Sequence, residues 1–457
     1  MQAEPDRVMF DPAFVDAQPP LPSRAERHRQ GIFDLPESNW NKAALGGQTL
    51  LALTRGRKRY LRALRTLLAV SGIYARWRAT GTKTDLQEAH HRAGLRLAAL
   101  ARHNGGGWVK AAQFFSTRSD ILPPAYIQAL QALQNDAEPI AFGEVEKVLA
   151  KSLGKQWRER FISVDETPVA TASIAQLHRA VLTDGREVAL KVRLPGVQKN
   201  FHEDARSFTL LARWAAPLVK ELDLNQIVAQ LIQMTTDELD FRHEAENLKR
   251  FARLPHGDMI RVPQLYEHLS SESLLVTGWE EGRRLREYLD ETPQEAARLL
   301  NILLGSYLQQ VTRFGIFQAD PHPGNFLVNT QGQIVILDYG AMGRLSSREV
   351  KSYSQLLYGL MGFAGSVDIG QLFVDAGFVG GTPEVLKALS DYMFTDKLKR
   401  SQPLQAMEEV LDIFREHHIR IPDSYVAISR VLITLGGFML NHDVRMDWTP
   451  PETRQVR

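Results

Sequence analysis

A single β-hairpin is predicted inside an otherwise helical second half of the chain. Two apolar runs, residues 326–328 and 334–337, flank the polar sequence Asn-Thr-Gln-Gly at residues 329–332, which is typical of a hairpin turn. From residue 292 onward the rest of the hydrophobic pattern has the period of a helix. The chain must therefore fold so that one short hairpin is held within a helical lobe.

A second β-rich region is predicted earlier in the chain. Residues 169–182 and 187–192 have strand-like patterns and are joined by Thr-Asp-Gly at 183–185, another hairpin turn. Helical patterns occupy residues 38–153 and 201–253. This order predicts an α+β fold with a helical extension, a small β-rich lobe that contains an inserted helical region, and a larger helical lobe.

The length of the chain sets its division into segments. A chain of 457 residues is too long for one small core and suggests two to three lobes. We expect a disordered arm (1–37), a helical extension (38–153), a small β-rich lobe (154–278), a larger helical lobe (279–445) and a tail (446–457). The arm is Pro-rich and charged, and it lacks the apolar centre of a secretory signal.

Composition excludes several kinds of chemistry and partner. The chain has no cysteine, which excludes disulfides, cysteine-ligated zinc, iron–sulfur clusters and thiol catalysis. A formal net charge of +2 argues against a protein that binds nucleic acid over its surface, so no nucleic-acid partner is expected. Apolar runs fall short of the ~20 residues that a bilayer span needs. We therefore expect a cytoplasmic protein, at most peripheral at the inner membrane, with no transmembrane segment.

A basic stretch precedes the β-rich lobe. Ten basic residues and no acidic residue lie between Glu37 and Asp85. On a helix, the basic and apolar residues of this stretch separate onto opposite sides. The basic side holds Lys58, Arg59, Arg62 and Arg65, and the apolar side holds Tyr60, Leu61, Leu64, Leu67 and Leu68. Such a helix can lie on an anionic membrane through residues 55–65, or it can pack on the protein and leave its basic face in water.

Polar groups suited to phosphoryl transfer lie at both ends of the hairpin at residues 326–337. Asp320 and Asn325 lie five residues apart just before it, and Asp338 follows its last strand. Phosphoryl transfer needs oxygen ligands for Mg²⁺ and an acceptor for the proton of the nucleophile. Asp320 is therefore the candidate proton acceptor, and Asn325 and Asp338 are candidate metal ligands. The alternative is that these residues are ordinary turn aspartates and a helix cap.

A cation for the phosphates is predicted in the β-rich lobe. Lys191 closes the apolar strand Val-Ala-Leu-Lys, which matches a pattern whose lysine holds the α- and β-phosphates of ATP. Upstream, small side chains occupy the place of a phosphate-binding loop, although alanine adopts positive φ less readily than glycine. The candidate nucleotide contacts are Ala170, Thr171, Ala172, Ser173, Lys191 and Gly278. The alternatives are a lysine on an exposed strand face and a small-residue strand packed on a neighbour.

An acidic helical stretch, residues 236–250, follows the β-hairpin of that lobe. On a continuous helix Asp240 and Glu244 would be i, i+4 neighbours. Like charges at that spacing destabilise a helix unless cations meet them. Lys191 is the expected partner of Glu244, and the alternative is a solvated acidic face.

Taken together, these motifs resemble the UbiB/ADCK (AarF-type) family of atypical kinase-like proteins, over roughly residues 85–445. The resemblance rests on Lys110-Ala111-Ala112-Gln113 with Ser116 to Pro124, on the Ala-rich loop continuing from Ser173 to Ala180, on Glu238-Leu239-Asp240, on Ala319 to Asn325, and on Asp338-Tyr339-Gly340.

The resemblance implies a bilobal protein-kinase-like fold that binds ATP or ADP with Mg²⁺ between its lobes. It also implies ATPase or unorthodox kinase activity, and a link to ubiquinone or another isoprenoid quinone at membranes. By position, Lys110 and Gln113 become a gating pair of the extension, Glu238 and Asp240 its acidic motif, Lys191 and Glu244 the catalytic ion pair, Asp320 the catalytic-loop aspartate, and Asn325 and Asp338 the metal ligands.

The chain departs from the family pattern in three places. Ala112 stands where the motif of the extension has glycine, which predicts a different backbone path there. Tyr339 replaces the phenylalanine of Asp-Phe-Gly. The chain also ends soon after Asp443, without the C-terminal membrane helices of many bacterial members, which leaves the 55–65 helix as the candidate anchor.

Three functions are consistent with these residues. The first is a UbiB-type ATP-dependent enzyme that acts on or extracts a lipid such as a quinone precursor. The second is a small-molecule phosphotransferase, although such enzymes lack an extension like the one that carries Lys110 and Gln113. The third is a nucleotide-switched lipid-binding chaperone with negligible turnover. An ordinary protein kinase is disfavoured because no Ala-Pro-Glu follows Asp338.

Overall fold

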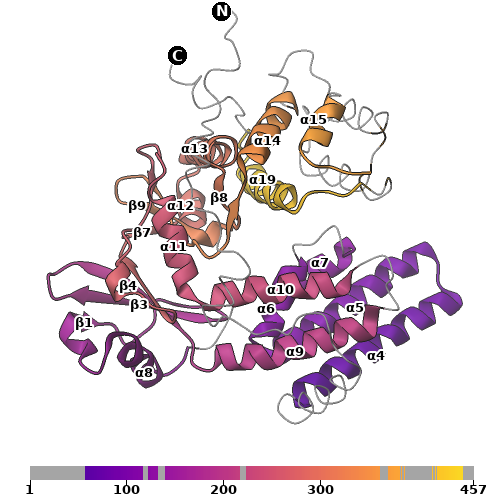
Figure 1. Cartoon of the computed structure of the whole chain (residues 1–457), viewed down its shortest axis with the longest axis horizontal. Coiled ribbons are helices and arrows are strands. Elements are labelled where there is room, and N and C mark those ends of the chain that lie inside the picture. Colours follow the sequence, from indigo (N-terminus) through magenta and orange to yellow (C-terminus); the bar gives the residue numbers. More distant parts are fainter. Residues whose placement is uncertain are drawn as a thin grey trace, which may run out of the picture. The chain divides into compact units, whose positions relative to one another are not determined.

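The chain forms two compact units (Figure 1). This computed structural model describes residues 57–116, 122–131, 139–216, 223–360, 369–380 and 419–445, with a few single residues between 381 and 418. The predictions for the arm (1–37), for Arg55 and for the tail (446–457) lie outside the described residues. The N-terminal unit runs to Ala245 and includes Leu265–Trp279, whereas the C-terminal unit comprises Glu246–Gln264 and the described chain from Glu280 onward.

A five-stranded antiparallel sheet lies in the described part of the N-terminal unit, in the order β1-β3-β4-β6 with β2 paired to β3. Its strands are β1 (Phe161–Val164), β2 (Ala170–Thr171), β3 (Ala175–Leu182), β4 (Glu187–Arg193) and β6 (Leu274–Gly278). The predicted turn joins β3 to β4, and Gly185 adopts a φ of 84° there. Val188, Leu190 and Val192 are fully buried with α8 (Phe142–Leu153), so Lys191 belongs to the opposite face.

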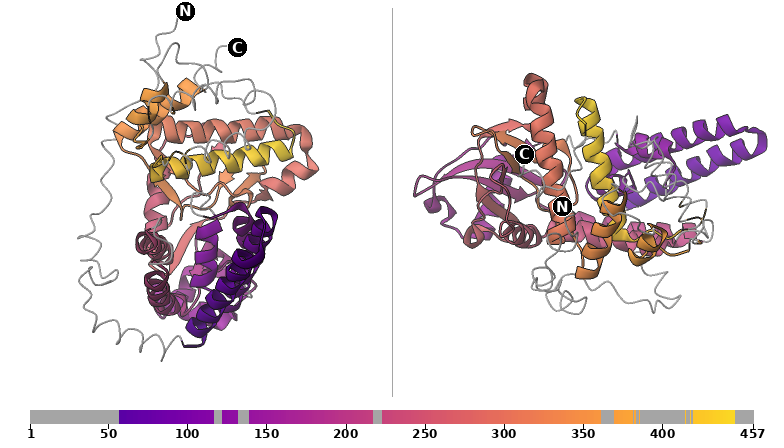
Figure 2. Two further views of the ribbon diagram at one scale, coloured as in Figure 1. Left: turned by 90° about the vertical axis from the view of Figure 1, so that its right-hand side faces the viewer. Right: turned by 90° about the horizontal axis from the view of Figure 1, so that it is seen from above.

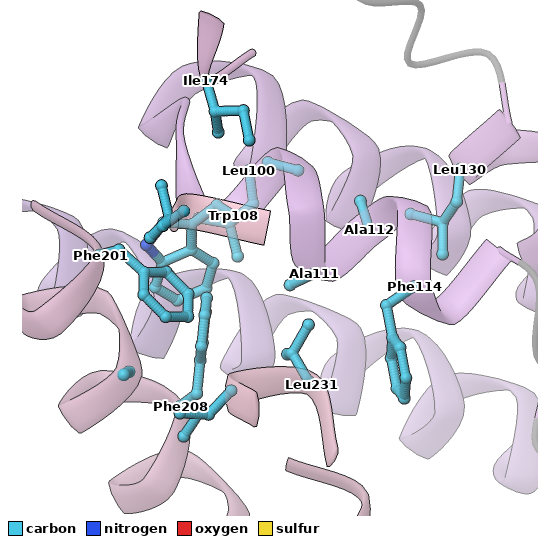
Figure 3. Close-up of a cluster of buried hydrophobic side chains, with 14 of the residues drawn as sticks. Leu100, Trp108, Ala111, Ala112, Phe114, Leu130, Ile174, Phe201, Phe208 and Leu231 are labelled. Atoms are coloured by element: carbon cyan, nitrogen blue, oxygen red, sulfur yellow. The ribbon is translucent and has the colours of Figure 1, made fainter. Parts of the chain in front are cut away.

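The helices of the N-terminal unit share a second core (Figure 3). They are α4 (Arg57–Thr80), α5 (Lys83–Asn104), α6 (Gly107–Ser116), α7 (Pro124–Gln131), α9 (Val197–Ala215) and α10 (Leu224–Leu239). The rings of Trp108 and Phe208 meet edge to face at 4.7 Å. Ala111 and Ala112 are buried in the same core, and α6 runs through Ala112 as a regular helix, so the helix needs no glycine at this position.

Helix α4 turns part of its basic side toward the protein, so the expected separation into a solvated basic face and a packed apolar face holds only in part: Lys58 and Arg65 are exposed and Tyr60 is buried. Arg59 Nη1 donates to both carboxylate oxygens of Asp204, at 3.2 and 3.3 Å. Arg62 donates to the side-chain oxygen of Asn104, whereas Leu68 of the predicted apolar side is 65% exposed. A buried carboxylate requires a cationic or hydrogen-bonding partner, and this requirement outweighs the simple face pattern.

Two sequence-based boundaries are also wrong. The strand predicted over residues 169–182 is divided, because β2 turns back after Thr171 and pairs with β3. The continuous helix predicted over residues 236–250 is interrupted: α10 ends at Leu239 and α11 (Phe241–Phe251) begins after Asp240. Asp240 has an extended conformation, with φ −112° and ψ 99°, so Asp240 and Glu244 are not neighbours on one helix.

The C-terminal unit contains the hairpin on which the sequence argument began. One sheet has the order β5 (Ile260–Arg261), β10 (Ile334–Ile336), β9 (Phe326–Asn329) and β7 (Gly282–Arg284), and β8 (Ile316–Gln318) pairs separately with β11 (Met342–Arg344). The antiparallel pairing of β9 with β10 confirms the predicted hairpin. The surrounding helices include α12 (Leu285–Glu291), α13 (Ala296–Gln309), α14 (Ser347–Leu360), α15 (Ile369–Asp375) and α19 (Asp423–Asn441).

Among the described residues, one helix is long and apolar enough to cross a membrane. It is α19, over Ser424–Asn441, and it includes the apolar run 431–440 that was expected to fall short. The same length and composition occur in core helices, and α19 lies beside α13 (Figure 2) with Val431, Leu435 and Met439 buried. The helix is therefore a weak candidate for a membrane span.

Candidate nucleotide and metal site

The structure places Lys191 against Glu244. Lys191 lies in β4, and its Nζ donates to both carboxylate oxygens of Glu244 in α11, at 2.7 and 2.8 Å. The Glu244 side chain is 6% exposed and the Lys191 side chain 27% exposed. The Nζ also lies 5.5 Å from the centre of the Phe241 ring. A lysine held in this way has a fixed direction, as a phosphate contact requires.

The Ala-rich loop is a tight turn that does not need glycine. None of Ala170, Thr171, Ala172 and Ser173 has a positive φ. The N–H of Ala172 donates to Ala175 O at 2.8 Å, so that donor is used within the turn. Gly278 ends β6 opposite Val188, on the strand next to Lys191.

Buried polar groups that sequence reasoning missed lie on β3, the strand with which Ala170 and Thr171 pair. His178 is 0% exposed; its ring nitrogens contact Asp165 O at 2.7 Å and the Gln176 amide nitrogen at 3.0 Å. The Gln176 side chain also bonds the backbone of Ile140 in both directions. Burial lowers the pKa of His178. The sequence signal was the presence of two polar residues at buried positions of an apolar strand.

The predicted gating residues are partly brought together. Lys110 of α6 lies 2.5 Å from a carboxylate oxygen of Glu238. Asp240 faces a different partner: its carboxylate accepts hydrogen bonds from the backbone N–H and guanidinium of Arg242. Although burial acts to raise the pKa of Asp240, these bonds hold it below the usual value. Gln113 lies one turn after Lys110, where its backbone carbonyl accepts from Ser116 Oγ.

A second missed residue, Arg193, holds the junction between α10 and α11. Its side chain is 8% exposed. Nη1 donates to the carbonyls of Leu239 and Glu272, and Nη2 donates to Gln198 at 3.2 Å. A cation at the last carbonyls of a helix stabilises that end, so Arg193 fixes the direction in which the chain enters α11. In the sequence it is a basic residue two positions after Lys191, with nothing to reveal its partners.

The C-terminal unit carries the oxygen ligands. Asn325 Nδ2 donates to the backbone carbonyl of Asp320 at 3.0 Å and to its carboxylate at 3.3 Å. Because Nδ2 makes both of these bonds, the amide oxygen of Asn325 takes no part in them. Burial and then the charge of Asp338 raise the pKa of Asp320. Asp320 is exposed to solvent in the structure, and the repulsion from Asp338 raises its pKa independently of burial.

Asp338 follows the buried strand β10, and its Oδ1 accepts from the N–H of Gly340 at 2.7 Å. The next side chain, Tyr339, is 1% exposed, packs on Phe251 and donates to Ile336 O at 2.8 Å. Asn247 of α11 donates to the carbonyl of Tyr339. The buried aromatic ring therefore fixes the backbone that presents the Asp338 carboxylate.

The oxygen donors of this unit fit Mg²⁺. Among the described residues, there is no group of three or more His, Cys, Asp or Glu side chains that could hold a metal ion. Mg²⁺ does not require such a cage, because it is commonly held by one or two carboxylates together with phosphate oxygens and water. Asn325 and Asp338 can supply two such ligands, and the mutual repulsion of Asp320 and Asp338 is what a nearby cation would relieve.

Comparison with known proteins decides the family. The ABC1 atypical kinase-like domain matches residues 132–363. The chain belongs to the ABC1 atypical kinase-like family. Mouse AarF domain-containing protein kinase 1 is 31% identical over 282 residues, which are 60% of this chain and 54% of the mouse protein. An uncharacterized chloroplastic aarF domain-containing protein kinase of Arabidopsis thaliana is 30% identical over 404 residues, 84% of this chain and 56% of the plant protein.

A solved structure supports the same family. The Mycobacterium tuberculosis protein Rv3197, determined in complex with erythromycin, matches with a TM-score of 0.52 and 26% identity, over 74% of this chain and 89% of that chain. The ABC1 family match and this neighbour confirm the α+β kinase-like fold and the UbiB/ADCK resemblance. The chain spans little more than half the length of the mouse and plant relatives.

Proposed function

We propose that this ABC1-family chain binds a Mg²⁺-nucleotide and carries out slow phosphoryl chemistry, as an atypical kinase or ATPase. The observation that carries the proposal is the Asp320 centre, where Asn325 Nδ2 donates to the backbone carbonyl and to the carboxylate of Asp320. Burial and the charge of Asp338 both raise the pKa of Asp320 there. Bound Mg²⁺ would neutralise charge on the phosphates. Asn325 and Asp338 would hold it, and Asp320 would accept the proton of the attacking hydroxyl or water.

The N-terminal unit would hold the phosphates. Lys191, already oriented by Glu244 at 2.7 and 2.8 Å, is the candidate cation for them. The turn at residues 170–173 and the end of β6 at Gly278 would contact the rest of the nucleotide. Because Ala172 N–H is already bonded to Ala175 O, we expect this turn to offer fewer backbone donors than an open glycine loop.

Lys110 would regulate this site through its ion pair with Glu238. Lys110→Ala should alter the preference between ATP and ADP or raise phosphorylation. Lys147→Ala is the matched control, since Lys147 is an exposed lysine paired with Glu144. Equal behaviour of the two variants would show that Lys110 is structural.

A lipid at a membrane surface is the proposed partner, with an isoprenoid quinone or its precursor as the candidate lipid. On α4, the residues Lys58, Arg65, Leu68 and Arg76 are exposed and fall within one stripe at helical spacing. A basic stripe with an exposed leucine is suited to an anionic bilayer surface. Within residues 55–65, Lys58 and Arg65 belong to this stripe and can face a membrane, whereas Arg59 and Arg62 bond within the protein.

The membrane proposal has its own test. Sedimentation with vesicles that contain anionic phospholipid should carry the chain down, and Lys58→Glu with Arg65→Glu should release it. Lys147→Glu is the control charge reversal. Binding unchanged by the double reversal, or equal binding to neutral vesicles, would contradict the role of α4.

Calorimetry with ADP and ATP tests the nucleotide proposal. We expect Mg²⁺-dependent binding by the wild-type chain, lost in Asp338→Asn and weakened in Lys191→Met. Asp290→Asn, an exposed substitution in α12, should leave binding unchanged. Unaltered Mg²⁺-nucleotide affinity and ATPase rate in Asp338→Asn would refute the proposal. Binding with negligible ATP hydrolysis, even with vesicles and quinone-like compounds, would favour a nucleotide-switched lipid chaperone, and rapid transfer to a soluble hydroxyl compound would favour a small-molecule phosphotransferase.

A further inference from the structure

A buried polar cluster lies directly beneath the Asp320 loop. It comprises Tyr307 on α13, Gln310 in the turn that follows, and Gln318 at the end of β8, and each residue is at most 1% exposed. Tyr307 donates to Gln318 Oε1 at 2.5 Å, and the backbone N–H of Gln318 donates to Gln310 Oε1 at 3.0 Å. Buried polar groups of this kind are stable only when their hydrogen bonds are satisfied, so the cluster specifies one arrangement.

Gln318 bonds both backbone groups of Asp320. Its Nε2 donates to Asp320 O at 2.6 Å, and its Oε1 accepts from Asp320 N at 3.2 Å. Asn325 Nδ2 donates to the same carbonyl at 3.0 Å. The peptide groups on either side of the Asp320 Cα are therefore fixed, and the carboxylate can move only by side-chain rotation.

The backbone groups of Asp320 fix the orientation of the Gln318 amide, and the Tyr307 hydroxyl holds the amide oxygen from the other side. An amide can be turned over with little change of shape, which would exchange its donor and acceptor. Turned over, the NH₂ of Gln318 would face the Asp320 N–H, its oxygen would face Asp320 O, and the Tyr307 hydroxyl would have to accept a hydrogen bond instead of donating one. Burial and the charges of neighbouring groups raise the pKa of Tyr307 well above its usual value, so the hydroxyl keeps the proton that it donates.

We propose that Gln318, held by Tyr307, is a positioning residue that sets the reach of the Asp320 carboxylate. The inference rests on the proposed function, in which Asp320 accepts a proton during phosphoryl transfer. Loss of the Tyr307 hydroxyl should loosen the Asp320 loop and lower turnover, because displacement of a catalytic group by about 1 Å is enough to slow a reaction substantially. Nucleotide affinity should change less than turnover, since Asp338, a proposed metal ligand, lies outside this loop and is held by the N–H of Gly340.

A matched pair of tyrosine variants tests the proposal. Tyr307→Phe removes the hydroxyl that contacts Gln318. Tyr353→Phe removes another hydroxyl of a tyrosine that is 1% exposed, one that bonds Ser424 Oγ at 2.7 Å instead. Gln318→Glu is a second, independent variant, because a carboxylate oxygen would then face the Asp320 carbonyl.

Two measurements separate the outcomes. Without nucleotide, hydrogen exchange of the peptide that covers residues 319–326 should accelerate in Tyr307→Phe and Gln318→Glu and stay unchanged in Tyr353→Phe. With Mg²⁺-ATP at saturation, turnover of Tyr307→Phe should fall about tenfold while the Kd for Mg²⁺-ADP changes less than about twofold. Equal losses in Tyr307→Phe and Tyr353→Phe, or unchanged loop exchange in Tyr307→Phe, would overturn the positioning role. Faster loop exchange in a chain whose wild type neither binds nor turns over nucleotide would overturn the proposed function and leave the contact itself supported.

Discussion

Asp204 provides the most quantitative prediction, because it is an ionisable side chain buried among three helices. It lies on α9 and is 1% exposed. Trp108 Nε1 on α6 donates to its carboxylate at 2.9 Å, and Arg59 on α4 pairs with it at 3.2 Å. Burial nevertheless raises the pKa of Asp204 to about 6, with Glu203 adding to the rise and Arg59 and Trp108 opposing it.

The expected change in stability follows from proton linkage. Below pH 3.8, the usual pKa, both the folded and unfolded states are protonated at this residue. As the pH rises toward 6 the unfolded state loses its proton first, so the folded state binds more protons and the free energy of unfolding falls. A shift of about two units corresponds to about 3 kcal/mol, and this loss is complete above pH 6.

Asp204→Asn isolates this effect. Asparagine retains an oxygen acceptor for Trp108 but cannot titrate. Urea denaturation between about pH 3.5 and pH 7.5, followed by hydrogen exchange of peptides from α6 and α9, gives the stability of the N-terminal unit for both chains. We expect the wild-type free energy of unfolding to fall relative to that of Asp204→Asn by about 3 kcal/mol across this range.

The exposed residue Asp184 is the control, because Arg186 holds its pKa below the usual value. For Asp184→Asn the corresponding difference should therefore not fall with rising pH. A wild-type minus Asp204→Asn difference that is independent of pH, or that increases with pH, would refute the assignment of a raised pKa to Asp204.

Three further predictions follow from close packing and buried polar contacts. Gly343→Ala should destabilise the C-terminal unit by about 1–3 kcal/mol in urea denaturation, because an added Cβ would lie 2.2–2.6 Å from ring atoms of the buried Phe317. Gly257→Ala is the control and should be tolerated, because no atom lies within 4 Å of its added Cβ. Equal losses of stability in the two variants would contradict this prediction. His178 should stay neutral in the folded state because burial lowers its pKa. Its contribution to stability is complete above pH 6.5, the usual pKa, and is lost as the pH falls below that value. An imidazole NMR signal of His178 that titrates at or above pH 6.5 would contradict the lowered pKa. Arg193→Met should lower the melting temperature of the N-terminal unit, at a cost of about 3 kcal/mol, because the carbonyl of Leu239 at the end of α10 and the loop carbonyl of Glu272 lose their donor. An unchanged melting temperature would show that water replaces the guanidinium.

The hairpin, the fold and the candidate ligands could be read from the sequence because they depend on local patterns. Hydrophobic period, turn residues and fixed spacings predicted β9, β10 and the α+β order, and these are confirmed. Asp320, Asn325 and Asp338 lie within a short stretch of chain, so their grouping needed no knowledge of distant contacts.

The contacts that hold these groups in place could not be predicted from the same patterns. Asp204 meets Arg59 and Trp108 across 145 and 96 residues of chain, and no local period indicates such a pairing. The predicted basic face of α4 was wrong at two residues for this reason: Arg59 pairs with the buried Asp204 and Arg62 bonds Asn104. Gln318 and Arg193 are polar residues next to apolar strands, a pattern that shows them to be unusual without naming their partners.

The interruption at Asp240 shows how one local feature serves two ion pairs of the N-terminal unit, Lys110–Glu238 and Lys191–Glu244. On a continuous helix, Asp240 and Glu244 would share a face and repel each other. The break removes that repulsion, because the Asp240 carboxylate instead accepts hydrogen bonds from the backbone N–H and the guanidinium of Arg242, in the first turn of α11. It also separates the directions of α10 and α11, so that Glu238 can meet Lys110 while Glu244 meets Lys191.

Arg193 holds this junction from the strand that carries Lys191, through the carbonyls of Leu239 and Glu272. A substitution at Lys110 removes one partner and leaves the junction in place. A substitution at Arg193 disturbs the junction from which both Glu238 and Glu244 are presented. The two ion pairs should therefore respond together to Arg193→Met and separately to Lys110→Ala, which distinguishes a shared structural origin from two independent contacts.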